Sequence, residues 1–196
     1  MKEQVLFREV MQNGIEDILE KHEIIPVVTI HSEQEIDQIF ESLRSRGINC
    51  IEITLRTEFS WEAISIFKER YGDVMDVGVG TIIKVADVQN CKDYEVDFMV
   101  SPGWTNALLQ HMRHSGIPFL PGVATPSEII RGIEMELNCF KFFPANIYGG
   151  VDALNTFNQV FKGVKFCPTG GINKENCHEF LSLDNVLSVG GSWVIK

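Results

Sequence analysis

Residues 50–55 read Cys-Ile-Glu-Ile-Thr-Leu, a short β-branched run with a single charged residue inside it. Successive side chains of a β-strand point to opposite faces of a sheet. Ile51, Ile53 and Leu55 therefore share one face, and Glu52 points to the other. The run predicts a strand that packs its apolar face under helices and turns a carboxylate toward the inside of the fold.

Residues 139–144, Cys-Phe-Lys-Phe-Phe-Pro, repeat this pattern with a lysine in place of the glutamate. Phe140 and Phe142 take the apolar face, and Lys141 takes the opposite one. A charged side chain is costly to bury inside a strand. Two such residues at equivalent places in their strands therefore indicate either a site of chemistry or a buried ion pair.

The two runs belong to eight strand-like segments that alternate with helix-like segments along the chain. Strands that alternate with helices form parallel sheets. The strands are expected at residues 24–30, 48–55, 74–80, 97–101, 118–121, 139–143, 164–168 and 186–189. The helices between them are expected at residues 33–46, 60–70, 85–94, 105–114, 126–136, 151–161 and 174–181.

The predicted fold class is α/β. An open doubly wound sheet and a closed (β/α)8 TIM barrel both suit the alternation, and the count of eight strands favours the barrel. No linker divides the 196 residues, so we expect a single barrel domain over residues 1–196. Only residues 190–196 follow the eighth strand, so we expect the eighth helix to be missing or truncated. A short amphipathic N-terminal helix is expected from the spacing of Val5, Leu6, Val10, Ile15, Ile18 and Leu19.

The composition excludes several classes of partner. The chain has 17 Lys and Arg against 27 Asp and Glu, a net charge of −10, which disfavours nucleic acid because phosphate binding needs clustered cations. No stretch approaches the roughly 20 apolar residues that cross a membrane, and residues 1–23 have no apolar core of a signal peptide. Reduced thiols in the cytoplasm are expected from the odd number and wide spacing of the cysteines, Cys50, Cys91, Cys139, Cys167 and Cys177.

Lys141 is the candidate nucleophile. An apolar cavity disfavours the charged form of a lysine, lowers its pKa and frees the amine lone pair to form a Schiff base. Glu52 is then the candidate proton shuttle, because imine formation and breakdown need a group that gives and takes protons. The alternative is a buried ion pair between the two residues without chemistry. Lys162 and Lys165 lie at or before the start of the seventh strand, at the opposite end from the chemistry of a parallel barrel.

Two pairs of glycines follow the seventh and eighth strands. Gly170 and Gly171 form the first pair, and Gly190 and Gly191 form the second, with Ser192 directly after it. Glycines let backbone N–H groups approach an anion closely, and Ser192 adds a hydroxyl. The matching positions predict a phosphate site, although a lone pair of glycines is also typical of an ordinary turn.

Arg56 and Thr81 lie at the ends of the second and third strands. Arg56 suits bidentate binding of a substrate carboxylate, and its alternative is a surface salt bridge with Glu58. Thr81 is expected to point its hydroxyl into the mouth of the barrel. The five histidines have no metal-binding spacing, so we expect no metal site.

Seven motifs at strand ends resemble one known family, the 2-keto-3-deoxy-6-phosphogluconate (KDPG) aldolases, which also covers 4-hydroxy-2-oxoglutarate aldolases. The resemblance extends from about residue 25 to 195 in order. The motifs are IEITLRT (51–57), VGVGT (77–81), VSPG (100–103), PGVATP (121–126), FKFFPA (140–145), CPTGGI (167–172) and VGGSW (189–193).

The resemblance implies a class I aldolase on a (β/α)8 barrel, usually a homotrimer, with no metal or other cofactor. Lys141 matches the Schiff-base lysine, and Glu52 matches the general acid and base. The other matched positions are Arg56 and Thr81 as binders of the pyruvate carboxylate, Pro102, Phe143 and Thr169 as pocket lining, and Gly170, Gly171, Gly190, Gly191 and Ser192 as the phosphate site.

The expected activity is the reversible cleavage of KDPG, a small phosphorylated keto acid, to pyruvate and glyceraldehyde 3-phosphate. The alternatives are 4-hydroxy-2-oxoglutarate or 2-keto-3-deoxy-6-phosphogalactonate as the substrate. More distant alternatives are a phosphosugar isomerase or decarboxylase on the same barrel, and a non-catalytic phosphosugar-binding protein. An imine-forming strand lysine separates the aldolases from the isomerases and decarboxylases, and turnover in a coupled pyruvate assay separates them from a non-catalytic protein.

Overall fold

The structure, a computed structural model, describes residues 14–195. The strands are β1 Ile24–Val28, β2 Cys50–Thr54, β3 Asp76–Gly80, β4 Phe98–Val100, β5 Phe119–Leu120, β6 Gly122–Val123, β7 Cys139–Phe142, β8 Lys165–Pro168 and β9 Val189–Gly191. The helices are α2 Ile36–Arg44, α3 Ser60–Tyr71, α4 Val85–Asp93, α5 Asn106–Ser115, α6 Pro126–Glu134, α7 Gly150–Val160 and α8 Cys177–Leu181, with short 3₁₀ turns η1 Glu33–Glu35 and η2 Trp193–Ile195.

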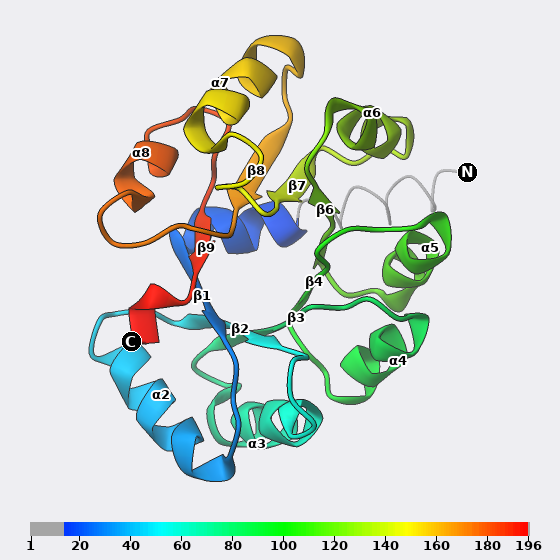
Figure 1. The fold of residues 1–196 in the computed structure, drawn as a ribbon. Helices are drawn as coiled ribbons and strands as arrows, with labels where there is room; N and C mark the ends of the chain where they lie inside the picture. Colours follow the sequence, from blue (N-terminus) through cyan, green and yellow to red (C-terminus); the bar gives the residue numbers. More distant parts are fainter. Residues whose placement is uncertain (1–13, 196) are drawn as a thin grey trace.

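All strand pairs are parallel, and the strands gather around a common centre with the helices outside them (Figure 1). The expected closed barrel of eight strands is nevertheless wrong. The strands form two separate sheets, one of six strands in the order β5-β4-β3-β2-β1-β9 and one of three strands in the order β6-β7-β8. The expectation that one domain covers residues 1–196 stays a prediction.

Pro121 accounts for the first interruption between the sheets. The sequence predicts one strand at residues 118–121, but the structure has β5 before Pro121 and β6 after it. β5 pairs with β4, and β6 pairs with β7. Because proline has no N–H to donate, the chain changes its pairing partner at this residue.

The second interruption lies between β8 and β9. Only isolated bridges are found here within residues 14–195, one from Phe166 to Val186 and one from Thr169 to Gly190. The segment leading into β9 has one more residue between these bridges than β8 has, which is the geometry of a bulge. An extra residue on one side breaks a regular ladder, so the two sheets do not close on each other.

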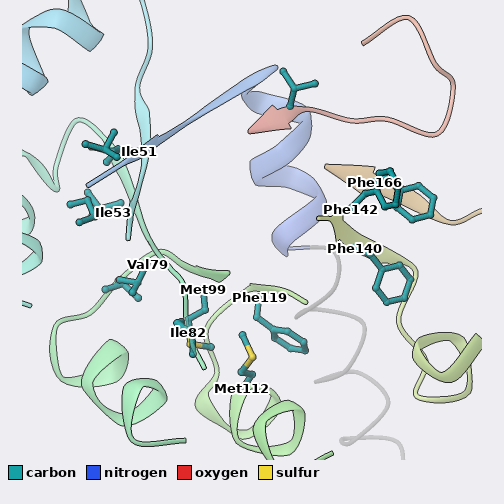
Figure 2. Close-up of a cluster of buried hydrophobic side chains, with 14 of the residues drawn as sticks. Ile51, Ile53, Val79, Ile82, Met99, Met112, Phe119, Phe140, Phe142 and Phe166 are labelled. Atoms are coloured by element: carbon teal, nitrogen blue, oxygen red, sulfur yellow. The ribbon is translucent and has the colours of Figure 1, made fainter. Parts of the chain in front are cut away.

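The alternation predicted for residues 50–55 and 139–144 is confirmed. Ile51 and Ile53 are fully buried in the layer between strands and helices, and so are Phe140 and Phe142. Figure 2 shows this layer, with Ile51 and Ile53 on one side of the view and the three phenylalanines Phe140, Phe142 and Phe166 on the other. The opposite faces of the same strands supply a smaller inner cluster that includes Cys50, Cys139 and Cys167.

A helix over residues 14–21 completes the inner cluster. Ile15 and Leu19 of this helix are buried against the inward-facing strand residues. Lys21 and His22 follow, and each makes a 2.7 Å contact with the carboxylate of Asp76 at the start of β3. The predicted N-terminal helix is thus confirmed for this part, whereas Val5, Leu6 and Val10 lie outside the described residues.

The start of α6 shows how local sequence fixes an element. The Thr125 hydroxyl accepts a hydrogen bond from the backbone of Glu128, and the Glu128 carboxylate accepts one from the backbone N–H of Thr125 at 2.8 Å. Pro126 occupies the first turn, where no N–H is required. Such reciprocal capping satisfies helix N–H groups that otherwise have no partner.

Among residues 14–195, no helix is long and apolar enough to cross a membrane.

The close packing of the inner cluster can be tested by substituting Gly78 in β3. A Cβ on Gly78 would lie 2.2 Å from the ring of Phe98, whereas a Cβ on Gly103 would have no atom within 4 Å. We expect Gly78→Ala to lower stability by about 1–3 kcal/mol, since extra volume in a packed core forces side chains off their rotamers. Gly103→Ala is the matched control, and we expect it to change stability by less than about 1 kcal/mol.

Thermal melts of the two variants and the wild-type protein measure the difference. A loss of about 1–3 kcal/mol corresponds to a melting temperature several degrees lower for a chain of this size. Equal melting temperatures for Gly78→Ala and Gly103→Ala would contradict the packing seen in the structure.

Candidate active site

Lys141 and Glu52 meet at the centre of the molecule. Lys141 is in β7 and Glu52 is in β2, so the two residues come from different sheets. The Lys141 Nζ donates a hydrogen bond to the Glu52 Oε1 at 3.3 Å. Lys141 is 4% exposed and Glu52 is 3% exposed. The structure therefore brings together the two charged strand residues that the sequence singles out.

The Phe143 ring also lies close to the amine. The Lys141 Nζ is 5.3 Å from the centre of the Phe143 ring, within the range of a cation–π contact. Phe140 and Phe142 belong to the outer layer and are not the phenylalanines that face the amine. A carboxylate and one aromatic face thus flank the lysine.

Gly80 makes room for the Glu52 carboxylate. A Cβ on Gly80 would lie 1.9 Å from the Glu52 Oε1, so any other residue would displace the carboxylate. Thr81 follows directly and has a φ of 66°, a left-handed conformation that is costly for a β-branched residue. Such strain concentrates at functional sites. The sequence identifies Thr81 but gives no signal for the role of Gly80, because the contact joins two strands.

Pro102 lies against Gly122 of β6, the strand that pairs with the lysine strand β7. Gly122 pairs in register with Lys141, and a Cβ on Gly122 would lie 2.3 Å from the backbone carbonyl of Pro102. The loop that follows β4 therefore reaches the edge of the strand next to Lys141. The role of Pro102 as pocket lining stays a prediction.

The predicted phosphate loops lie next to each other at the ends of β8 and β9. Thr169 is buried and forms a bridge with Gly190, and a Cβ on Gly190 would lie 2.5 Å from the Thr169 hydroxyl oxygen. Gly170 and Gly171 have φ values of 102° and 74°, which favour glycine. Gly191 is buried in β9 at the end of the second loop. Gly190 thus lies beside Thr169, at the start of the first loop, but Gly190 and Gly191 lie within β9, whereas the sequence predicts them after the strand. The phosphate site stays a prediction.

Arg56 and Ser192 are both exposed. Arg56 lies two residues beyond the end of β2, and Ser192 precedes η2. Within residues 14–195, no salt bridge joins Arg56 to Glu58, so the surface ion pair that the sequence left open is not formed. Both side chains are free to turn toward a ligand.

The remaining nucleophiles near the centre do not compete with the lysine. Cys167 pairs in register with Lys141, and burial raises the pKa of its thiol to about 11. A thiol with so high a pKa is protonated at neutral pH and is a poor nucleophile. Lys165 donates a hydrogen bond to the backbone carbonyl of Asp184 at 2.8 Å, at the other end of β8. In the described part of the chain, no group of three or more His, Cys, Asp or Glu side chains could hold a metal ion.

The arrangement suits amine chemistry coupled to proton transfer. A primary amine shielded from water can condense with a carbonyl group once it is uncharged. A carboxylate at hydrogen-bond distance can take up and return the protons of that condensation. Glycines such as Gly170 and Gly171, which follow the strand beside β7, let backbone N–H groups approach an anion closely, and the predicted phosphate site stays a prediction.

Comparisons with known proteins agree with this chemistry. A family model described as KDPG and KHG aldolase matches residues 15–196. The 2-dehydro-3-deoxy-phosphogluconate aldolase of Zymomonas mobilis is 38% identical over 181 residues, which are 92% of this chain and 86% of that protein.

Two solved structures are similar over nearly the same length. The first is the KDPG aldolase of Legionella pneumophila, with pyruvate captured at low pH as a covalent carbinolamine intermediate. It is 39% identical and has a TM-score of 0.87, and the match covers 91% of this chain and 86% of the Legionella pneumophila chain. The 2-keto-3-deoxy-6-phosphogluconate aldolase of Zymomonas mobilis with 3-phosphoglycerate is 37% identical and has a TM-score of 0.88. The match covers 93% of this chain and 86% of the Zymomonas mobilis chain. The match of the family model and of these relatives over most of their length shows that this chain belongs to the KDPG and KHG aldolase family.

Proposed function

We propose that this protein is a class I aldolase, a lyase that cleaves KDPG reversibly to pyruvate and glyceraldehyde 3-phosphate. The observation that carries the proposal is the buried amine of Lys141, 3.3 Å from the Glu52 carboxylate. Buried ion pairs seldom add net stability, so a pair in this position needs another reason to exist. Membership of the family, and the covalent pyruvate adduct of the Legionella pneumophila relative, support an imine as that reason.

In the proposed reaction, the neutral Lys141 amine attacks the C2 ketone of KDPG and forms a carbinolamine. Loss of water gives a protonated imine, which accepts the electron pair of the breaking C3–C4 bond. Glu52, directly or through a water molecule, removes the proton of the C4 hydroxyl, and glyceraldehyde 3-phosphate leaves as the aldehyde. Glu52 then returns a proton to C3 of the enamine, and hydrolysis of the imine releases pyruvate and the free amine.

The remaining site residues are assigned by their positions. We assign Arg56 and Thr81 to the substrate carboxylate, because a guanidinium binds a carboxylate bidentately and Thr81 adjoins Gly80 beside Glu52. The distal phosphate is assigned to the two glycine loops. Pocket lining is assigned to Pro102, Phe143 and Thr169, and phosphate binding to Gly170, Gly171, Gly190, Gly191 and Ser192.

The second candidate substrate is 4-hydroxy-2-oxoglutarate, which would give pyruvate and glyoxylate. The family model covers aldolases of both compounds. 4-Hydroxy-2-oxoglutarate has no phosphate, so its cleavage would leave the glycine loops without a ligand. The neighbouring loops therefore favour the phosphorylated substrate.

The assembly and the location of the protein are also proposals. Family membership supports a homotrimer. Five free cysteines, four of them buried, support a reducing compartment such as the cytoplasm.

Reductive trapping tests the nucleophile. Treatment with pyruvate and borohydride should add a stable mass to the peptide that contains Lys141, because reduction makes an imine irreversible. Lys141→Arg keeps a positive charge beside Glu52 but cannot form the adduct, so we expect no added mass in this variant. Peptide-mapping mass spectrometry gives the result.

Lys162→Arg is the matched control, since Lys162 is exposed between α7 and β8. This variant should be trapped like the wild-type protein. An adduct on Lys162, or on any lysine other than Lys141, would refute the assignment.

The role of Glu52 in proton transfer is tested by Glu52→Gln. Glutamine keeps the shape and one acceptor oxygen but cannot carry the proton, so we expect kcat to fall by about 10²–10⁴-fold. Glu58→Gln changes an exposed carboxylate of the next loop and should alter kcat by less than about twofold. A coupled pyruvate assay measures kcat, and circular dichroism checks the fold. Near-normal kcat in a folded Glu52→Gln protein is the result that this role does not allow.

A further inference from the structure

The hydroxyl groups of Thr29 and Thr54 meet where β1 and β2 end. The two strands pair in parallel with Val27 opposite Glu52. Thr29 lies two positions after Val27, and Thr54 lies two positions after Glu52, so this register places the threonines opposite each other. Their hydroxyl oxygens are 2.8 Å apart. Because strand side chains alternate with a period of two, both threonines share the inward face with Glu52.

The hydrogen bonds of Thr54 fix which hydroxyl of the pair donates. The Thr54 hydroxyl donates to the backbone carbonyl of Val28 at 3.1 Å. A carbonyl can only accept, and a hydroxyl has a single hydrogen to give. Thr29 is therefore the donor in the contact with Thr54. Within residues 14–195, the Thr29 oxygen has no second hydrogen-bond partner. It offers a ligand lone pairs but no proton.

Thr29 is also the accessible member of the pair. Thr54 is fully buried, whereas Thr29 is half-buried. Its neighbours Val28 and Ile30 are fully buried in the layer between strands and helices, on the opposite face of the chain. Thr29 directly follows the carboxyl end of β1. Ligands of parallel α/β sheets bind at the carboxyl ends of the strands, so the free side of the Thr29 oxygen lies where a substrate binds.

The Glu52 carboxylate lies in the same row of inward-facing positions. Thr54 pairs in register with Gly80 of β3, and a Cβ on Gly80 would collide with the Glu52 carboxylate. The carboxylate thus occupies the place of the side chain that Gly80 lacks. The row runs from Thr29 through Thr54 to Gly80. The Thr29 hydroxyl is therefore two strand spacings from the carboxylate, or about 10 Å along the row.

This separation suits two neighbouring hydroxyl groups of one substrate. In the proposed reaction, Glu52 takes the proton of the C4 hydroxyl of KDPG, and C5 carries the next hydroxyl. Two hydrogen bonds of about 2.8 Å each, joined by hydroxyl groups on adjacent carbons, span most of the row. β1 also lies between β2 and β9 in the sheet. A substrate that extends from Glu52 toward the glycines of β9 therefore passes Thr29.

We propose that Thr29 sets a preference for substrates with a hydroxyl group on C5, which donates a hydrogen bond to the Thr29 oxygen. An oxygen whose only proton is already engaged accepts from a hydroxyl but cannot donate to a carboxylate. Because C5 of 4-hydroxy-2-oxoglutarate is a carboxylate carbon, Thr29 favours KDPG over this compound. The inference rests on the proposed function, since it assumes that the keto acid is held between Lys141 and Glu52.

The competing explanation is that the threonine pair only ties β1 to β2. Thr29→Val separates the two explanations, because valine keeps the branched shape and removes the hydroxyl. Loss of a tie between strands would weaken all reactions of the site alike. Loss of a substrate contact weakens only the reactions of compounds that carry the C5 hydroxyl.

The experiment uses the synthetic direction, in which pyruvate adds to an aldehyde. D-Glyceraldehyde 3-phosphate supplies the C5 hydroxyl, and 3-oxopropyl phosphate is the same aldehyde without it. The readout is the ratio of kcat/KM for the first aldehyde to that for the second, measured by consumption of pyruvate. We expect this ratio to fall about three- to tenfold in Thr29→Val, as for the loss of one neutral hydrogen bond. Thr29→Ser keeps a hydroxyl and should retain the ratio within about twofold.

Thr156→Val is the matched control, because Thr156 is exposed on α7 and should leave the ratio unchanged. Thr29→Ala removes the same hydroxyl with less bulk and gives the same test if Thr29→Val does not fold. As a second readout, the ratio of kcat/KM for cleavage of KDPG to that of 4-hydroxy-2-oxoglutarate should fall in the same variants.

An unchanged aldehyde ratio in a folded variant without the hydroxyl would overturn the assignment, and so would an equal loss for both aldehydes. Pyruvate trapping on Lys141 keeps these outcomes distinct from failure of the proposed function, because trapping needs no aldehyde.

Discussion

A lysine and a glutamate share a space from which water is almost excluded, and the rest of the site is arranged around that contact. Removing one partner of a buried ion pair costs about 3–5 kcal/mol, whereas apolar residues of similar size often serve stability equally well. The pair of Lys141 and Glu52 is therefore better explained by chemistry than by folding. Gly80 leaves the volume that the carboxylate occupies, and Phe143 covers the amine.

The faces of the strands could be predicted from the sequence because strand periodicity is local. Alternation at residues 50–55 and 139–144 is enough to send Glu52 and Lys141 inward and their apolar neighbours outward. The closure of the sheet could not be predicted in this way. It depends on the pairing partners at Pro121 and on one extra residue before β9, and both are properties of the pairing between strands, which the alternation within one strand does not show.

The same limit explains which site residues the sequence misses. The role of Gly80 depends on the side chain of Glu52, 28 positions earlier in the sequence. A glycine at this place has no spacing that indicates a role in the site by itself. The glycine pairs could be predicted, because their positions after successive strands repeat.

The central claim is that the shielded amine of Lys141 forms a covalent bond with a keto acid while Glu52 remains beside it. A crystal structure of the protein soaked in pyruvate tests this claim most directly. The account predicts continuous electron density from the Lys141 Nζ to C2 of pyruvate, with the Glu52 carboxylate within hydrogen-bond distance of the adduct. Pyruvate bound without a bond to Lys141, or an adduct with Glu52 turned away from it, would contradict the account.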